Sequence, residues 1–201
     1  APTSGTARVA GFDVTENPVE VKRAIGYLPE DIVAFAYLTG EEYLHFVAAC
    51  RRMDRPLEKR RTDELLELFE QNDQRRSLIR TYTAGMARRL TLAGALLPDP
   101  PILLLDEPTA NLDPESSDLV RRLLRGLTDR GRTILMSTHL LTSAEKSADR
   151  VVFIRGGKLI LDRRLAALRA DFPGQDLDEI YLKATGQGAE ERSRRFLDGL
   201  G

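Results

Sequence analysis

Two adjacent carboxylates, Asp106 and Glu107, are the residues of this sequence best placed to do chemistry. They directly follow the apolar run Ile102 to Leu105, which predicts a strand that is covered on both faces in a parallel sheet. Ligands bind at the carboxyl ends of such strands. Asp106 is therefore placed to hold a metal ion, directly or through water, and Glu107 to orient or deprotonate a water molecule. A solvated Asp-Glu turn after a core strand is the alternative for this dipeptide alone.

Two further groups of residues suit the handling of a phosphate. Thr83, Ala84 and Gly85 come at the start of a helical pattern, whose first turn presents unpaired N–H groups and a positive dipole end. Thr83 supplies a hydroxyl, and Gly85 permits close approach of the backbone. His139 follows a predicted strand, where its imidazole could hydrogen-bond a phosphate. The alternatives are an ordinary helix cap at Thr83 and a structural histidine.

These residues and other motifs, in the same order, resemble the nucleotide-binding domain of ATP-binding cassette (ABC) transporters of the multidrug or export type. Asp106 and Glu107 match the Walker B aspartate and the catalytic glutamate, and His139 matches the switch histidine. Tyr82 to Met86 takes the place of the signature motif, and Asp178 to Gly186 is similar to the end of export-type domains. The remaining matches are Asn111-Leu112-Asp113 for the D-loop and Ile25 to Glu30 for the segment ending in the Q-loop residue.

The resemblance implies an ATPase that uses ATP and Mg²⁺. Glu107 and His139 would be its catalytic residues, and Asp106 and Glu30 would serve the metal ion. Hydrolysis would be phosphoryl transfer, driven mainly by positioning and charge neutralisation. The residues implied in nucleotide binding, partly across a dimer, are Thr83, Ala84, Gly85 and Asp113.

Partners and location also follow from the resemblance. A second ATP-binding cassette would form a homo- or heterodimer with this chain, and transmembrane permease subunits would couple ATP-driven dimerisation to export. The chain would be cytoplasmic and peripheral to the cytoplasmic face of the membrane. No nucleic-acid partner is expected, because 30 basic residues balance 31 acidic ones. The alternatives are a degenerate, non-catalytic cassette that regulates or complements a partner, and a soluble cassette ATPase not linked to transport.

Three departures from the family pattern bear on the expected chemistry. Glu30 stands where many cassettes have glutamine, and Thr83 with Ala84 makes the signature motif degenerate. No Gly-x-x-x-x-Gly-Lys-[Ser/Thr] P-loop (Walker A) occurs, and Gly157-Lys158 is the only Gly-Lys pair. Because the residues after Ala1 correspond to the turn soon after that loop, we expect a fragment of a longer reading frame, or a natural truncation, that is inactive alone.

Composition bounds the fold that must carry these residues. A chain of 201 residues that is 42% hydrophobic predicts one domain, with room for an inserted subdomain. A single cysteine, Cys50, forms no internal disulfide and fits a reducing compartment. No apolar run approaches the ~20 residues that cross a bilayer, and no signal peptide opens the sequence. We expect an α/β fold with a P-loop NTPase-type, mainly parallel sheet, an inserted helical subdomain and an incomplete N-terminal part.

The order of the patterns divides the chain into four expected parts. Residues 1–30 are the first part of the α/β ATPase core, without a P-loop, and residues 31–97 are a helical subdomain with the signature motif. Residues 98–165 are the rest of the core, and residues 166–201 are a helical tail. The resemblance implies that Ala34 to Tyr43 forms part of a docking surface for a membrane subunit.

Caps and apolar spacing predict the elements around the site. Thr39 is the expected cap of a helix that begins at Gly40; a second helix is expected to open near Thr62 and a third near Gly85. The strand after Ile102 to Leu105 is expected at Thr133 to Ser137.

Overall fold

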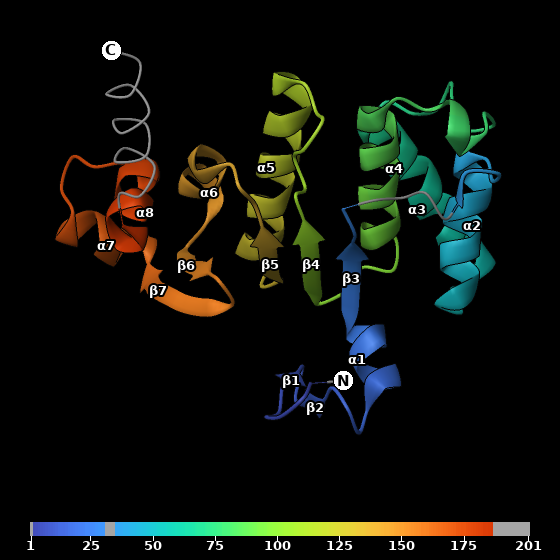
Figure 1. The fold of residues 1–201 in the computed structure, drawn as a ribbon. Coiled ribbons are helices and arrows are strands. Elements are labelled where there is room, and N and C mark those ends of the chain that lie inside the picture. Colours follow the sequence, from blue (N-terminus) through green and yellow to red (C-terminus); the bar gives the residue numbers. More distant parts are fainter. Residues whose placement is uncertain (1, 31–34, 187–201) are drawn as a thin grey trace, which may run out of the picture. The chain divides into compact units, whose positions relative to one another are not determined.

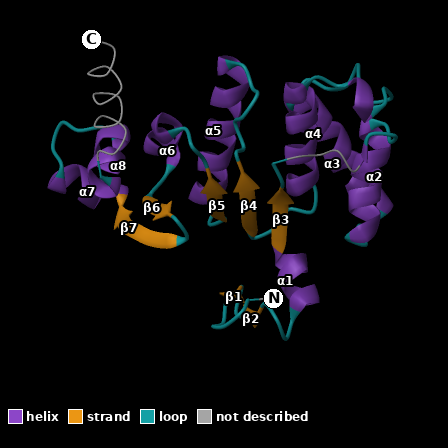
Figure 2. Cartoon of the chain, viewed as in Figure 1, coloured by secondary structure: helices purple, strands orange, loops and turns teal. Residues whose placement is uncertain are grey.

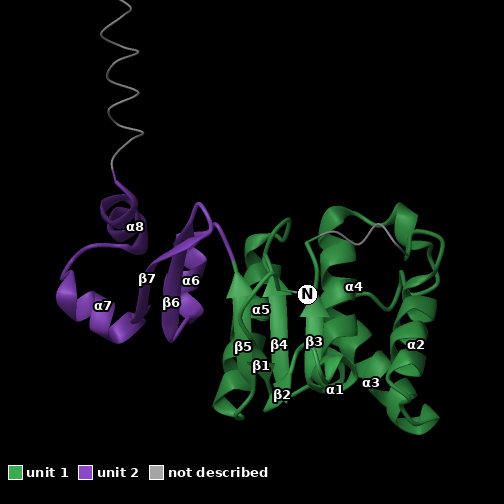
Figure 3. Cartoon of the chain, turned by 60° about the horizontal axis from the view of Figure 1, so that its bottom comes forward, with its two compact units in different colours: residues 1–137 green, residues 138–201 purple. Residues whose placement is uncertain are grey.

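The computed structural model describes residues 2–30 and 35–186. By its internal contacts the chain separates into two units, residues 1–137 and 138–201, coloured separately in Figure 3. Each unit has its own cluster of buried apolar side chains. Each is therefore described by itself, and the four-part organisation expected from the sequence stays a prediction.

A three-stranded parallel sheet is the centre of the first unit. Its strands are β3 (Ile25–Leu28), β4 (Ile102–Asp106) and β5 (Thr133–Ser137), in the order β3-β4-β5 (Figure 1). Leu28 lies opposite Leu105, and Asp106 lies opposite Ser137. All three strands therefore end at one edge of the sheet, and the residues that follow them are brought together there.

Three helices between β3 and β4 form most of the remainder of this unit (Figure 2). They are α2 (Gly40–Cys50), α3 (Arg55–Leu68) and α4 (Ala84–Leu96), and the short 3₁₀ turn η2 (Ile79–Thr81) precedes α4. The expected cap of α2 is confirmed, because the Glu42 N–H donates to Thr39 Oγ1 at 3.2 Å and the Thr39 N–H donates to Glu42 Oε2 at 2.8 Å.

The expected start of the second helix near Thr62 is wrong. Helix α3 begins at Arg55, and Asp54 stands at its N-cap position. Pro56 lies in the first turn, where a residue without an N–H is well tolerated and its fixed φ favours the helix. The proline therefore opens the helix, and Thr62 is a buried residue in the middle of it.

The other elements of the first unit are smaller or flank the sheet. The strands β1 (Arg8–Val9) and β2 (Phe12–Asp13) form a hairpin. Helix α1 (Pro18–Ala24) precedes β3 in the chain, and α5 (Pro114–Asp129) connects β4 with β5. The hairpin turn is Ala10-Gly11, with φ of 52° and 83°. Both values are those of a two-residue turn that suits the twist of antiparallel strands.

Helix α4 packs against β3 without intervening side chains at one position, Gly26. A Cβ atom on Gly26 would overlap the carbonyl oxygen of Ala95 in α4, and it would lie 2.7 Å from Pro100 Cγ. Only hydrogen fits this contact, because real Cβ atoms do not come that close to backbone or ring atoms. The start of β3 and the last turn of α4 are thereby held in direct contact.

Within residues 138–186, the second unit consists of an antiparallel hairpin and three helices. The strands β6 (Arg150–Arg155) and β7 (Lys158–Arg164) turn at Gly156-Gly157. Phe153 is buried and meets Tyr181 edge to face, with ring centroids 5.2 Å apart. The helices are α6 (Leu141–Ser147), α7 (Leu165–Asp171) and α8 (Leu177–Thr185).

In the parts of the chain that the structure describes, no helix combines the length and the apolar character that a membrane span requires. The expected helical tail is described only as far as residue 186, and its last residues, 187–201, lie outside the described residues.

Candidate functional site

Asp106 and Glu107 lie at the carboxyl edge of the sheet, where the sequence placed them. Asp106 is the last residue of β4, and Ser137 at the end of β5 donates its hydroxyl to Asp106 Oδ1. The Glu107 N–H donates to the Ser137 carbonyl at 3.0 Å, which extends the pairing of the two strands by one residue. Glu107 has a φ of 48°, in the left-handed region, so the backbone turns sharply immediately after Asp106.

Glu30 reaches the same edge from β3, two residues beyond the end of that strand. A side chain that the sequence analysis did not single out, Arg88 of α4, connects this segment with β4. Its Nη2 donates to the Glu30 carbonyl at 2.6 Å, and its Nη1 donates to the carbonyls of Pro29 at 2.8 Å and Asp106 at 3.1 Å. Arg88 is only 4% exposed. The apolar spacing of α4 gave no signal for it, because it lies outside the predicted buried positions.

The first turn of α4 contains the residues expected to bind a phosphate. Thr83 is the N-cap, and its Oγ1 accepts the Met86 N–H at 3.2 Å. Ala84 is exposed and begins the helix. A Cβ on Gly85 would lie 2.9 Å from the carbonyl oxygen of Asn111, so the loop after β4 lies directly on this turn. The structure thus brings the predicted signature motif and D-loop together, and their role toward nucleotide stays a prediction.

Asp113, the last residue of that loop, is the N-cap of α5. Its carboxylate accepts the Ser116 N–H at 2.8 Å and the Ser116 hydroxyl at 2.6 Å. The bond from the Ser116 hydroxyl, followed by the bond from its N–H, holds the pKa of Asp113 below its ordinary value. Asp113 is therefore ionised at neutral pH, and its carboxylate caps the N-terminus of α5. Its expected contact with nucleotide remains a prediction.

His139 is the predicted site residue that belongs to the second unit. It is exposed and lies between Thr138, whose Oγ1 accepts the Leu140 N–H at 3.0 Å, and the start of α6. The other predicted site residues lie in the first unit, and the expected role of His139 as the switch histidine stays a prediction.

The side chains at this edge of the sheet are suited to bind Mg²⁺, but they provide only part of a binding site for ATP. Asp106, Glu107 and Glu30 offer the carboxylate oxygens that Mg²⁺ prefers. Among the described residues, no group of three or more His, Cys, Asp or Glu could hold a metal by itself. That is how protein Mg²⁺ sites commonly look, because phosphates and waters supply the other oxygens. The sequence holds no P-loop, so the backbone cradle for phosphates of this chain's own nucleotide is not among these residues.

Comparison with known proteins places these features in context. The family described as ABC transporter matches residues 1–110. The daunorubicin/doxorubicin resistance ATP-binding protein DrrA of Streptomyces peucetius is 37% identical over 189 residues, which is 94% of this chain and 57% of that protein. This chain spans 57% to 60% of the length of curated relatives of this kind.

Two solved structures have the same fold. An ATP-binding subunit of an ABC transporter matches with a TM-score of 0.85 and 29% identity, over 92% of this chain and 78% of that chain. A dimeric ATP-binding cassette in a post-hydrolysis state, bound to ADP and Pi, matches with a TM-score of 0.73 and 21% identity, over 82% of this chain and 75% of that one. At that identity, the second likeness concerns the fold alone.

Proposed function

Because this chain belongs to the ABC transporter family, we propose that it is the ATP-binding and ATP-hydrolysing part of a membrane exporter. The family and the α/β fold predicted from the sequence are both confirmed. The proposal concerns the activity of the protein that contains these residues, since the chain spans 57% of the length of the Streptomyces peucetius relative.

The observation that carries the proposal is the pair Asp106 and Glu107 at the end of β4, whose following loop lies on the first turn of α4. Bound Mg²⁺ would neutralise charge on the phosphates of ATP. Asp106, fixed by the Ser137 hydroxyl, would hold the metal ion directly or through water. Glu107 would orient the attacking water and accept its proton, a contribution of roughly 10²–10⁴ in rate. Glu30 would reach a metal-bound water from the neighbouring strand.

The first turn of α4 would bind the γ-phosphate of a nucleotide held by a second cassette. Thr83 and Gly85 lie at the positive end of a helix dipole, and the turn is exposed at Thr83 and Ala84. Catalysis would then require a dimer. His139, in the second unit, would sense the γ-phosphate of a bound nucleotide.

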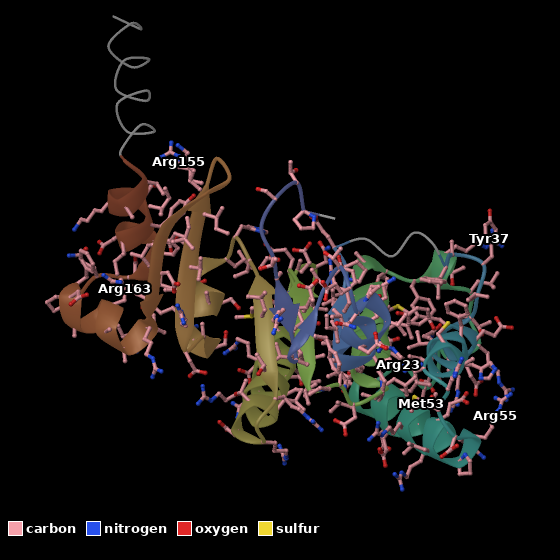
Figure 4. The ribbon with its side chains drawn as sticks, turned by 90° about the horizontal axis from the view of Figure 1, so that it is seen from below. Arg23, Tyr37, Met53, Arg55, Arg155 and Arg163 are labelled. Atoms are coloured by element: carbon pink, nitrogen blue, oxygen red, sulfur yellow. The ribbon has the colours of Figure 1, made fainter. Side chains whose placement is uncertain are left out.

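Membrane subunits would dock on the cytoplasmic side, next to the segment that follows the Q-loop position. Tyr37 in that segment is 83% exposed, and Figure 4 shows it pointing away from the ribbon. Ala34, the first residue of the expected docking surface, lies outside the described residues. The substrate would be chosen by the membrane subunits, and the resistance function in the relative's name makes a drug-like compound the first to test.

A first prediction concerns nucleotide binding by the 201-residue chain itself. We expect weak or no binding of ATP, because the P-loop supplies most backbone donors to the phosphates and the sequence lacks one. Titration with a fluorescent ATP analogue, with and without Mg²⁺, measures this. Low-micromolar binding that depends on Mg²⁺ would contradict the prediction. The matched positive control is this chain with a Gly-x-x-x-x-Gly-Lys-[Ser/Thr] P-loop segment fused before residue 1, called the fusion cassette below.

A non-catalytic cassette is the second candidate. Its support is that Thr83 and Asp113 are both used as helix caps and that Ala84 places a methyl group where a phosphate would approach. The fusion cassette separates the two candidates. Steady hydrolysis of ATP supports the exporter ATPase, whereas binding of ATP without hydrolysis supports the regulatory role.

A further inference from the structure

The buried arginine of α4 contacts both segments that carry the expected metal residues. Arg88 is 4% exposed, and its guanidinium donates to three backbone carbonyls: those of Pro29, Glu30 and Asp106. The first two belong to the loop after β3, and the third belongs to the last residue of β4. One side chain therefore ties together three elements, β3, β4 and α4.

We propose that Arg88 is a positioning residue, which sets the Glu30 segment against Asp106 and couples both to the first turn of α4. The catalytic importance of this positioning rests on the proposed ATPase function. The contacts on which it stands do not depend on that function.

The choice of acceptors supports this role. The guanidinium holds the backbone of Glu30 and of Asp106, with N–O distances of 2.6 and 3.1 Å, so it fixes the points from which the two carboxylates extend. It does so without using the carboxylate oxygens in these bonds. A planar fork with several donors can bridge two chain segments, which the single ammonium group of lysine cannot do with the same geometry.

The cost of burying a charge supports it as well. A guanidinium that is removed from water must be compensated by hydrogen bonds, and an apolar side chain would fill the same space without that cost. Arg88 is compensated by carbonyl dipoles at the edge of the sheet, within 3.1 Å of the Asp106 carbonyl oxygen. Its positive charge therefore lies at the carboxyl edge of the sheet, against the backbone of Glu30 and Asp106.

A second arginine, comparable to Arg88, contacts the C-terminal end of α4 from a neighbouring helix. Arg61 of α3 donates to the carbonyl of Leu97, the C-cap of α4, at 3.1 Å and pairs with Asp99 at 3.1 Å. Arg61→Lys removes a comparable bond between arginine and the main chain without touching the β3 and β4 segments. It is the control for Arg88→Lys.

The first test uses the 201-residue chain and needs no nucleotide. In amide hydrogen exchange, Arg88→Lys is expected to speed exchange about tenfold in peptides covering residues 26–30 and 104–110, the local effect of losing one strong hydrogen bond. Arg61→Lys is expected to leave both peptides unchanged. Unchanged exchange in Arg88→Lys would overturn the proposal. So would global unfolding of Arg88→Lys under conditions where Arg61→Lys stays folded, because Arg88 would then support the whole unit rather than two segments.

The second test uses the fusion cassette and separates positioning from mere support of the fold. Arg88→Lys is expected to lower kcat about tenfold, to change KM for ATP less than about twofold, and to raise the Mg²⁺ concentration for half-maximal rate. A loss of folded protein alone would lower the rate and leave the Mg²⁺ dependence where it was, and that result would refute the role. If the unmodified fusion cassette hydrolyses no ATP, the proposed function fails, while the exchange experiment still decides on Arg88.

Discussion

Replacing Glu107 by glutamine lowers ATP turnover by the fusion cassette at least about 100-fold, while ATP binding persists. Glutamine has the same shape as glutamate and keeps an oxygen acceptor, but it cannot take a proton from water. The backbone at position 107 has a φ of 48°, and the two residues tolerate that conformation equally well because neither is branched at Cβ. The substitution therefore removes the base and leaves the loop in place.

Phosphate release under single-turnover and steady-state conditions measures this loss, and binding of a fluorescent ATP analogue measures what remains. Glu67→Gln is the control, because Glu67 is an exposed acid in α3 and is not one of the expected site residues. Its turnover is expected to stay within about twofold of the unmodified protein. If Glu107→Gln turned over ATP at the unmodified rate, Glu107 would have no role as the base.

The second large effect is on stability. Gly26→Ala is expected to destabilise the first unit by about 3 kcal/mol, because the added methyl group overlaps the Ala95 carbonyl oxygen and lies 2.8 Å from Leu103 Cδ2. Main-chain atoms of α4 cannot turn aside as a side chain can, so β3 and α4 must separate. Urea unfolding of the chain, followed by circular dichroism, gives the change in the free energy of unfolding.

Gly126→Ala is the matched control, with the opposite expected sign. Gly126 lies inside α5, and its added Cβ would meet only the far end of the Arg130 side chain, at 3.2 Å from Nη1. Alanine favours a helix over glycine by up to about 1 kcal/mol, so stability should rise. Equal destabilisation by both substitutions would show that loss of glycine, and not the contact of Gly26 with α4, is responsible.

The sequence predicts those elements that are stabilised by residues close together in the chain. The strand β4 follows from four consecutive apolar residues, and α2 follows from its capping box at Thr39. Helix α1 is not predicted from the sequence, because its seven residues include one buried side chain, Val21, and its N-cap makes no side-chain hydrogen bond. The sequence predicts the start of α3 too late, because Thr62 followed by two acids resembles a helix cap, although a proline such as Pro56 in a first turn favours a helix.

The same distinction holds for the residues of the site, some of which local sequence predicts while others depend on the fold. Asp106 and Glu107 could be predicted because a strand and its carboxyl end are local features. Arg88 could not, because its partners lie 18 to 59 residues away in the chain and only the folded backbone brings their carbonyls to it. Thr83 shows a third case, since a helix cap and a phosphate ligand use the same unpaired N–H groups and have the same sequence pattern.

The left-handed backbone at Glu107 has a consequence for how this protein can evolve. A residue other than glycine in that region costs about 1 kcal/mol, and glycine would occupy it without strain. Stability and activity therefore favour different residues at this one position. In a laboratory selection for resistance to heat, with no demand for ATP hydrolysis, the glutamate is expected to be replaced by glycine among the early substitutions. A parallel selection that also demands hydrolysis should keep it.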